Sequence, residues 1–429
     1  MLVSVILAAG KGTRMRSDLP KVLHPLLGVP ILEHVLDTVE ALGPQLKVVV
    51  VGYKHTDVEE SFPGRDIRWS LQADQLGTAH AANCGVEAAA AEISANPDAQ
   101  VLVVNGDLPL LRVETLKALS AVHREADAAV TILTCEKADP TGYGRIIRDA
   151  QGRVRDIVEE NDATEAEKRL REINVGAYVF RGGAFLGFYA RIGRDNAQGE
   201  LYLTDVVVKA AQAGTRVSSF KVADEAEVAQ VNSRIELARV TDILRTRLLD
   251  EYMRSGVTIY DPRTTYIEKG VRIGRDTHIL PFTMIEHGVE IGSGCEIGPF
   301  THLRPGTRLD DGASIGNFVE IKNSKVGHDS KVRHLSYVGD GLIGQKVNIG
   351  AGTIFANYDG KVKSTTVVED EAFVGSGTVL VAPVTVGKGA ITGAGSVVLK
   401  NRNVPAGGVA VGVPAQLLKE GKGSSNSRS

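Results

Sequence analysis

The sequence predicts two parts of different fold class, an α/β domain over residues 1–223 and a parallel β-helix over residues 256–415. In the first part, strand-like and helix-like stretches alternate, which is typical of a mostly parallel sheet covered by helices. In the second part, Ile, Leu and Val recur every six residues, the period of a parallel β-helix. Glycine is concentrated there: of 47 glycines, 23 lie in residues 256–400 and 19 in residues 1–255.

The composition is that of a globular protein and excludes several other classes. The chain is 43% hydrophobic and 24% charged, which are ordinary values. A net charge of −3 argues against a general nucleic-acid binder. No apolar run reaches about 18 residues, so no membrane span is expected. The first ten residues are interpreted as a strand and not as a signal peptide. The widely spaced Cys84, Cys135 and Cys295 exclude a disulfide framework and a Cys-rich zinc site, so we expect a cytoplasmic protein.

The α/β domain is predicted from short apolar runs rich in β-branched residues, with helical patterns between them. The predicted strands include residues 3–8, 47–51, 101–104 and 128–133, and the predicted helices include residues 31–42 and 79–93. Residues 224–255 are predicted to be a helical linker, with one long helix over residues 224–254. Acidic residues in its first turn suit the positive end of the helix dipole, and Gly256 is a plausible stop.

From Ile267 onward, ten successive sixth positions, ending at Ile321, are all Ile or Leu. After short slips the pattern continues to Val386. We expect these side chains to point inward and the glycine that often follows them to permit a tight corner. A Gly-rich β-sandwich is the alternative, but ten matches in a row disfavour it. The period breaks over residues 351–366, which predicts a projecting loop, and residues 416–429 are expected to be a disordered tail.

The first predicted strand runs into a glycine-rich turn whose backbone N–H groups could bind phosphate. Lys11, Arg14 and Lys21 bring three cations close to this turn. A dinucleotide site is disfavoured because Met15 stands where the third glycine of the fingerprint belongs, and no P-loop motif is present. Asp107 follows a predicted strand, where it could ligate Mg²⁺. The alternatives are a solvated basic loop and an ordinary turn aspartate.

Motifs in both parts resemble one known family. They lie at residues 7–15, 19–21, 72–78, 105–107, 142–145, 157–159, 172–174, 231–232 and 333–340. Together with the β-helix, they resemble the bacterial bifunctional enzymes that are both N-acetylglucosamine-1-phosphate uridylyltransferases and glucosamine-1-phosphate N-acetyltransferases. The resemblance covers about residues 1–415. It implies a Rossmann-like mixed sheet, a left-handed hexapeptide-repeat β-helix and a cytoplasmic homotrimer. It also implies UDP-N-acetylglucosamine synthesis for peptidoglycan, the cell wall and lipopolysaccharide.

For the uridylyl site, the resemblance implies a set of nucleotide- and sugar-binding residues: Leu7, Ala8, Ala9, Gly10, Lys11, Lys21, Gln72, Gly77, Thr78, Asn105, Gly144, Glu159, Asn174 and Asn232. Asp107 and Asn232 would hold Mg²⁺, the expected cofactor, while Arg14 and Lys21 would be catalytic cations that neutralise the triphosphate together with Lys11. The sugar phosphate would attack the α-phosphorus of UTP in line. No general base is needed, because a phosphate nucleophile is already ionised.

For the acetyl site, the resemblance points to His334 as the base. Acyl transfer to an amine needs a base, because a protonated amine has no lone pair, and histidine suits that task near neutral pH. The alternative is a surface or capping histidine. The residues implied to bind glucosamine-1-phosphate are Arg304, Lys322, Tyr337 and Asn348, and those implied to bind acetyl-CoA are Ala351, Asn357, Tyr358, Ser376, Ala394 and Gly412. Many family members carry Arg where Gly412 stands, and Tyr is common at the position of Asn105, so the contacts made at these two positions differ.

Two other functions stay open on the sequence. One is a different sugar-1-phosphate nucleotidyltransferase whose β-helix is not catalytic; His334 and the loop at residues 351–366 argue against it. The other is a non-enzymatic scaffold subunit, which has no need of Arg14, Lys21 and Asp107. On the leading interpretation the partners are small molecules and other copies of the chain, with neither nucleic acid nor membrane.

Overall fold

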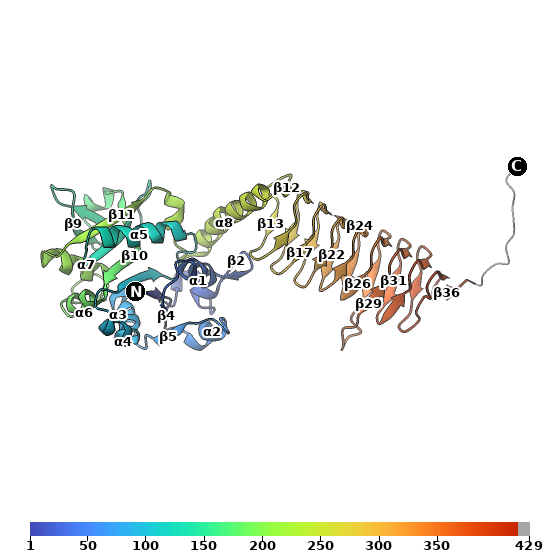
Figure 1. The fold of residues 1–429 in the computed structure, drawn as a ribbon, viewed down its shortest axis with the longest axis horizontal. Coiled ribbons are helices and arrows are strands. Elements are labelled where there is room, and N and C mark those ends of the chain that lie inside the picture. Colours follow the sequence, from blue (N-terminus) through green and yellow to red (C-terminus); the bar gives the residue numbers. More distant parts are fainter. Residues whose placement is uncertain (419–429) are drawn as a thin grey trace. The chain divides into compact units, whose positions relative to one another are not determined.

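The computed structural model describes residues 1–418, and the chain divides into two compact units between residues 242 and 243. Helix α8 (Arg234–Arg254) crosses this division. In Figure 1 the first unit is coloured blue to green and the second yellow to red. Within residues 1–418, no helix has the length and apolar character needed to cross a membrane.

The first unit is built on a nine-stranded mixed sheet, as expected. Seven strands follow the spatial order β11-β7-β10-β6-β1-β4-β5, and β8 and β9 form a hairpin attached to β10. Their bounds are β1 (Leu2–Leu7), β4 (Leu46–Val51), β5 (Arg68–Leu71), β6 (Gln100–Asn105), β7 (Val130–Glu136), β8 (Arg145–Arg148), β9 (Val154–Val158), β10 (Glu172–Arg181) and β11 (Val217–Val222). Strand β10 is antiparallel to β6 and β7, whereas β1, β4, β5 and β6 are parallel.

Helices cover both faces of this sheet. They are α1 (Ile31–Ala41), α2 (His55–Glu60), α3 (Thr78–Ala88), α4 (Ala90–Ala95), α5 (Val113–Glu125), α6 (Gly182–Tyr189) and α7 (Leu203–Gln212). Alternate strand residues enter different apolar cores, because successive side chains of a strand point to opposite faces. Val48 and Val50 pack with α3, α6 and α7, and Val49 and Val51 pack with α1 and α5. The predicted helix over residues 79–93 is interrupted at Ala89, where α3 ends.

The prediction of a single helix over residues 224–254 is wrong at its start. A short 3₁₀ helix, η4 (Glu225–Val228), is capped by Asp224, residues 229–233 are not helical, and α8 begins only at Arg234. The Val231 N–H donates to the backbone oxygen of Asp107 over 3.2 Å, and the Gln230 side chain donates to the backbone oxygen of Val175. These contacts with distant parts of the first unit outweigh the local helical pattern. They also place Asn232 at the carboxyl edge of the sheet.

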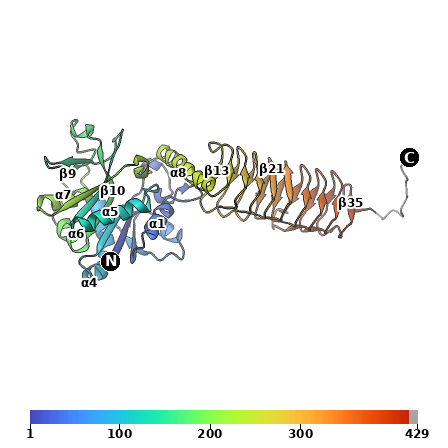
Figure 2. The ribbon, with the colours of Figure 1, turned by 45° about the horizontal axis from the view of Figure 1, so that its top comes forward.

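The second unit is a left-handed parallel β-helix with three sheets (Figures 1 and 2). The first sheet contains β12 (Thr258–Ile259), β15 (His278–Ile279), β18 (Glu296–Ile297), β21 (Ser314–Asn317), β24 (Lys331–His334), β27 (Asn348–Ile349), β30 (Phe373–Val374), β33 (Ile391–Thr392), β35 (Val409–Val411) and β36 (Gln416–Leu417). The second contains β13 (Tyr266–Ile267), β16 (Met284–Ile285), β19 (His302–Leu303), β22 (Glu320–Lys322), β25 (Tyr337–Gly339), β28 (Ile354–Ala356), β31 (Val379–Val381) and β34 (Val397–Val398). The third contains β14 (Arg272–Ile273), β17 (Glu290–Ile291), β20 (Arg308–Leu309), β23 (Lys325–Val326), β26 (Gly341–Ile343), β29 (Thr366–Val368) and β32 (Val384–Val386).

The six-residue period marks the interior of this β-helix, as predicted. The ten positions from Ile267 to Ile321 are buried, except Ile273, which is partly buried against the same core. The prediction of a tail from residue 416 is wrong at its start, because Gln416 and Leu417 form β36, antiparallel to β35. The rest of the expected tail, from residue 419, lies outside the described residues.

The glycines that follow the buried residues have a different role from the predicted one. A Cβ atom at Gly316 would lie 2.0 Å from the backbone oxygen of Arg333 on the next coil, so glycine is required by close stacking of coils. The left-handed corners come two residues later in each repeat, at Gly306 (φ 81°) and also at Phe300 (φ 53°). The turn itself therefore tolerates side chains, whereas a side chain at position 316 would collide with the next coil.

Candidate active sites

A cavity of about 280 Å³ lies at the carboxyl edge of the first unit's sheet, where ligands bind in open α/β folds. Ten of the residues predicted for the uridylyl site line it: Leu7, Ala8, Ala9, Gly10, Lys21, Gln72, Gly77, Thr78, Asn105 and Asp107. Gln75 and Glu200 also line it and were not predicted. Gln75 donates to the backbone oxygen of Ala9 over 3.0 Å, and its place within the motif at residues 72–78 was a signal that could have found it. Glu200 carried no such signal.

Lys21, Asp107 and Asn232 meet at this cavity. The Lys21 ammonium lies 2.5 Å from Asp107 Oδ2 and 3.1 Å from Asn232 Oδ1. The other carboxylate oxygen, Asp107 Oδ1, is buried and has no hydrogen-bond partner in the described structure. Carboxylate and amide oxygens suit Mg²⁺, which usually completes its coordination with water and substrate phosphate. Within residues 1–418, no group of three or more His, Cys, Asp or Glu side chains is placed to hold a metal ion.

The other two predicted cations lie on the glycine-rich turn and not in the cavity lining. Lys11 Nζ lies 5.3 Å from the centroid of the Tyr53 ring, and Arg14 is exposed in the 3₁₀ turn η1 (Thr13–Met15). The turn packs closely on Lys21, because a Cβ atom at Gly12 (φ 66°) would lie 2.6 Å from Lys21 Cβ. Glycine at position 12 therefore lets the turn approach the cation that holds Asp107.

The three residues predicted to bind the sugar lie together beside the β8–β9 hairpin. The Asn174 N–H donates to the backbone oxygen of Gly144 over 2.8 Å. A Cβ atom at Gly144 would lie 3.2 Å from the Glu159 carboxylate. Burial raises the pKa of Glu159, although a hydrogen bond from Thr204 opposes this shift. The Asn174 side chain donates to the Tyr178 hydroxyl over 2.6 Å, which fixes the orientation of its amide.

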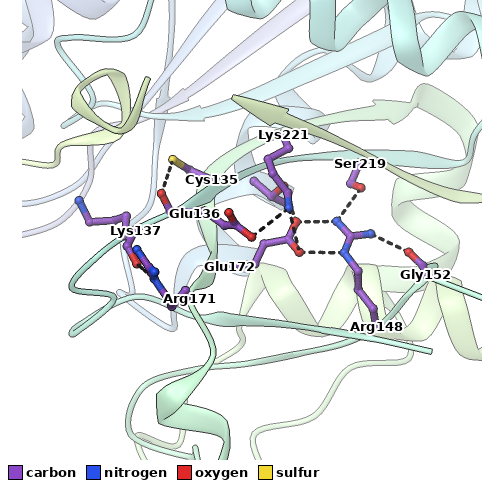
Figure 3. A network of polar contacts seen from close by, with 10 residues as sticks. Cys135, Glu136, Lys137, Arg148, Gly152, Arg171, Glu172, Ser219 and Lys221 are labelled. Atoms are coloured by element: carbon purple, nitrogen blue, oxygen red, sulfur yellow. Dashed lines mark hydrogen bonds and ion pairs between the residues drawn. The ribbon is translucent and has the colours of Figure 1, made fainter. Parts of the chain in front are cut away.

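A polar network fixes this hairpin to β10 (Figure 3). The Glu172 carboxylate accepts hydrogen bonds from Arg148 Nε (2.8 Å) and Nη2 (2.5 Å) and from Thr134 Oγ1 (2.8 Å). Burial opposes ionisation of Glu172, but the bonds from Arg148 and Thr134 outweigh it and lower the pKa of this carboxyl. Arg148 lies on β8 and Glu172 lies two residues before Asn174 on β10, so the network sets the spacing between Gly144 and Asn174.

In the β-helix, strand order brings the residues predicted for glucosamine-1-phosphate binding onto neighbouring coils. His334 ends β24 with an exposed side chain, and its backbone oxygen accepts from the Gly352 N–H and the Ser336 hydroxyl. Asn348 lies on the next strand of the same sheet, paired with Lys331. Three further predicted residues lie on or beside the second sheet: Arg304, Lys322 and Tyr337. Arg304 contacts Glu320 over 2.8 Å.

The predicted acetyl-CoA residues lie on later coils. The backbone oxygens of Ala351 and Ser376 accept from residues 377 and 395 over 2.7 Å each, so Ala351, Ser376 and Ala394 follow one another along the stack. Asn357 is buried and donates to Asp340 Oδ2 over 2.5 Å, whereas Tyr358 is exposed.

Asp340 contacts the loop that carries Asn357, and Gly412 lies near the end of the β-helix. Asp340 also accepts from Asn323 over 2.6 Å; it was not singled out from the sequence, although it lies in the motif at residues 333–340. Gly412 adopts a left-handed φ of 96° and its backbone oxygen accepts from the Val397 N–H.

Comparison with known proteins supports both units. The family model for a MobA-like NTP transferase domain matches residues 4–173, and the model for the bacterial transferase hexapeptide matches residues 270–304 and 290–323. Bifunctional protein GlmU from an Exiguobacterium species is 44% identical, over 97% of this chain and 98% of that protein. The chain belongs to the GlmU family. The GlmU proteins of Brevibacillus brevis and Geotalea uraniireducens are each 42% identical over at least 96% of both chains.

Membership of the GlmU family confirms the predicted resemblance and the predicted enzyme. The first unit is the nucleotidyltransferase and the β-helix is the hexapeptide transferase. A β-helix without catalytic function and a non-enzymatic scaffold are both disfavoured, because the GlmU relatives match nearly the whole chain and are named as bifunctional proteins.

Proposed function

We propose that this GlmU-family enzyme first acetylates glucosamine-1-phosphate with acetyl-CoA and then transfers UMP from UTP to N-acetylglucosamine-1-phosphate. The products of the second step are pyrophosphate and UDP-N-acetylglucosamine, a precursor of peptidoglycan and lipopolysaccharide. The observation that carries the proposal is the group of Lys21, Asp107 and Asn232 in a chain that matches bifunctional GlmU proteins over 97% of its length.

The test is to incubate the pure protein with glucosamine-1-phosphate, acetyl-CoA, UTP and Mg²⁺, and then to omit one component at a time. Acetyl transfer is expected to continue without UTP and without Mg²⁺. Formation of the nucleotide sugar is expected to stop without acetyl-CoA and to return when N-acetylglucosamine-1-phosphate is added. Efficient uridylyl transfer to glucosamine-1-phosphate itself would contradict the proposed order of steps.

In the uridylyl site, Asp107 and Asn232 would hold Mg²⁺, which when bound neutralises phosphate charge. The buried, unpaired Asp107 Oδ1 supports this assignment, because a buried carboxylate oxygen without a partner is costly. Lys21 bonds to both side chains, so it orients the two oxygens and adds a cation beside the phosphates. Gly144, Glu159 and Asn174 would bind the sugar, and the nucleophile needs no base because it is a phosphate oxygen.

In the acetyl site, the exposed imidazole of His334 would accept a proton from the sugar amine as the amine attacks the thioester carbonyl. Arg304 and Lys322 would bind the sugar phosphate. Because Arg304 is paired with Glu320, the phosphate would compete with this carboxylate. Tyr337 and Asn348 would orient the sugar, and the loop that carries Asn357 and Tyr358 would bind acetyl-CoA together with Ala351, Ser376, Ala394 and Gly412.

We further propose that the enzyme is a homotrimer in the cytoplasm, assembled through one corner of the β-helix. Four large apolar side chains on successive coils of this corner are exposed: Phe282, Phe300, Phe318 and Leu335. The phenylalanine rings stack with centroids 4.8 and 5.1 Å apart. Exposed apolar patches of this kind mark interaction sites, and Leu335 directly follows His334, so a neighbouring copy here would contribute to the acetyl site. The three cysteines are free thiols, which fits a reducing compartment.

Replacement of Phe300 by aspartate is expected to break this trimer, because the charge would have to be buried without a partner in the interface. Light scattering coupled to size-exclusion chromatography measures the molar mass of the oligomer. Acetyl transfer should decrease when the trimer dissociates. Leu342→Asp is the matched control, since Leu342 is equally exposed but lies on the third sheet. A stable trimer of the Phe300→Asp variant would place the interface elsewhere.

We propose that residues 1–223 form the uridylyltransferase domain, to which the segment 224–255 adds Val228 and Asn232, that this segment is an α-helical linker only from Arg234 onward, and that residues 256–415 are the acetyltransferase domain. A fragment ending at residue 256 is expected to be a soluble monomer that transfers UMP to N-acetylglucosamine-1-phosphate and lacks acetyl transfer. The reason is that both apolar cores of the first unit are complete by Val228. Leu249 packs in the core of the β-helix, so Leu249→Ser in the fragment should improve solubility. An inactive, folded fragment would show that the uridylyl site needs the β-helix.

A further inference from the structure

The Gln72 side chain in the uridylyl cavity is held in one orientation. Gln72 follows β5, is 4% exposed and lines the cavity. Its Nε2 lies 3.1 Å from the backbone oxygen of Gly77 and 3.1 Å from His80 Nδ1. Because a carbonyl oxygen can only accept, the amide nitrogen must face Gly77, and the amide oxygen therefore points the other way. His80 Nδ1 must then accept the second amide proton.

This arrangement also fixes the tautomer of His80. With Nδ1 as an acceptor, the ring proton of the neutral imidazole is on Nε2, which lies 3.8 Å from Cys84 Sγ. His80 and Cys84 are four residues apart on α3, so they share one face of the helix. Both protons of the Gln72 amide are used inside the protein, and Oε1 is the atom of this amide that remains for a ligand.

We propose that His80 is a positioning residue that makes Gln72 an obligate hydrogen-bond acceptor in the uridylyl cavity and thereby favours a uracil base over cytosine at Gln72 Oε1. The inference rests on the proposed uridylyl function. The N3–H of uracil can donate to Oε1, whereas N3 of cytosine presents a lone pair to the same oxygen. A Gln72 amide that could turn over would donate to cytosine, and the acceptors at Gly77 and His80 oppose that rotation.

The test compares UTP and CTP as substrates of the full-length enzyme, with N-acetylglucosamine-1-phosphate and Mg²⁺. His80→Ala is expected to raise KM for UTP by roughly ten-fold with little change in kcat, and to lower the UTP-to-CTP ratio of kcat/KM by roughly ten-fold or more, as for loss of one buried hydrogen-bond partner. His80→Asn, whose side-chain oxygen can replace Nδ1, is expected to restore most of the preference. His80→Phe keeps a ring without an acceptor and should behave as His80→Ala does.

Cys84→Ala is the matched control, because it removes the partner of Nε2 and leaves the Nδ1 acceptor; its UTP-to-CTP ratio should equal that of the wild type. Acetyl transfer by the same preparations shows that the chain is folded. An unchanged UTP-to-CTP ratio in both His80→Ala and His80→Phe, or no recovery in His80→Asn, would overturn the inference. Failure of the wild-type enzyme to prefer UTP would instead refute the proposed uridylyl function.

Discussion

Replacement of Asp107 by alanine is expected to reduce uridylyl transfer by roughly a thousand-fold or more, the scale of a lost metal ligand, and to leave acetyl transfer unchanged. Asp107 is buried, its Oδ2 lies 2.5 Å from Lys21 Nζ, and its Oδ1 has no partner among the described residues. The variant would lose the carboxylate proposed to hold Mg²⁺ and would leave the Lys21 ammonium without its counter-charge. Release of pyrophosphate from UTP and N-acetylglucosamine-1-phosphate measures the loss.

Two further variants sharpen this experiment. Asp107→Asn keeps an oxygen at the site but removes the negative charge. We expect this variant to lose part of its uridylyl transfer activity and to regain some of it at higher Mg²⁺ concentrations. Asp98→Ala removes an exposed carboxylate of the same unit and should be as active as the wild type. If folded Asp107→Ala enzyme, verified by its acetyl transfer, retains near-normal uridylyl transfer, the metal assignment is wrong.

Replacement of His334 by alanine is expected to slow acetyl transfer by roughly a hundred- to ten-thousand-fold, the usual contribution of a general base. Uridylyl transfer to added N-acetylglucosamine-1-phosphate should be unaffected. Release of the CoA thiol measures the acetyl step. A pH profile of the wild type alone is ambiguous, because the sugar amine also becomes protonated in acid. The variant separates the two causes, since only the titration of the substrate remains in it.

His328→Ala is the control for this variant, because His328 is another exposed histidine of the β-helix, paired with Asp329 over 3.3 Å. Its acetyl transfer should stay within about two-fold of the wild type, as for most surface substitutions. Equal, small losses in the His328 and His334 variants would mean that His334 is a structural residue, and the base would have to be sought among the other side chains of the site.

Local patterns in the sequence predict much of this fold. The period of six places Ile267 and its successors in the interior, because the three-sided coil repeats its inward direction at that interval. The apolar runs predict the strands of the α/β unit, since a buried strand needs little beyond apolar, β-branched residues. The motif at residues 72–78 contains three of the ten predicted residues that line the cavity, Gln72, Gly77 and Thr78, together with the unpredicted Gln75.

Contacts between distant residues could not be predicted. The break before α8 depends on the backbone hydrogen bond from Val231 to Asp107, and no local sequence pattern near residue 229 predicts it. The role of Gly316 was wrongly predicted because the obstacle to a side chain is Arg333 on the next coil. The hydrogen bond between Arg148 and Glu172 likewise joins β8 and β10, and the sequence does not show that these two strands lie side by side.

The coils of the β-helix differ in their number of residues, and most predicted acetyl-site residues lie on its later coils. Thr258 and His278, paired on the first coil, are 20 apart, and His278 and Glu296 on the next coil are 18 apart. Ser314, Lys331 and Asn348 then follow at intervals of 17. Arg304 is the one predicted site residue in the early 18-residue coils, and each coil before it adds one strand spacing, about 4.8 Å, to the length of the β-helix. Deleting one whole coil would shorten the β-helix by one strand spacing and leave the remaining apolar side chains facing inward. A one-residue deletion within a strand would turn its apolar side chains outward, whereas the 17-residue coils keep Val326 and Val332 in the interior. This stack can therefore lose whole coils, or residues between its strands, but not residues within a strand.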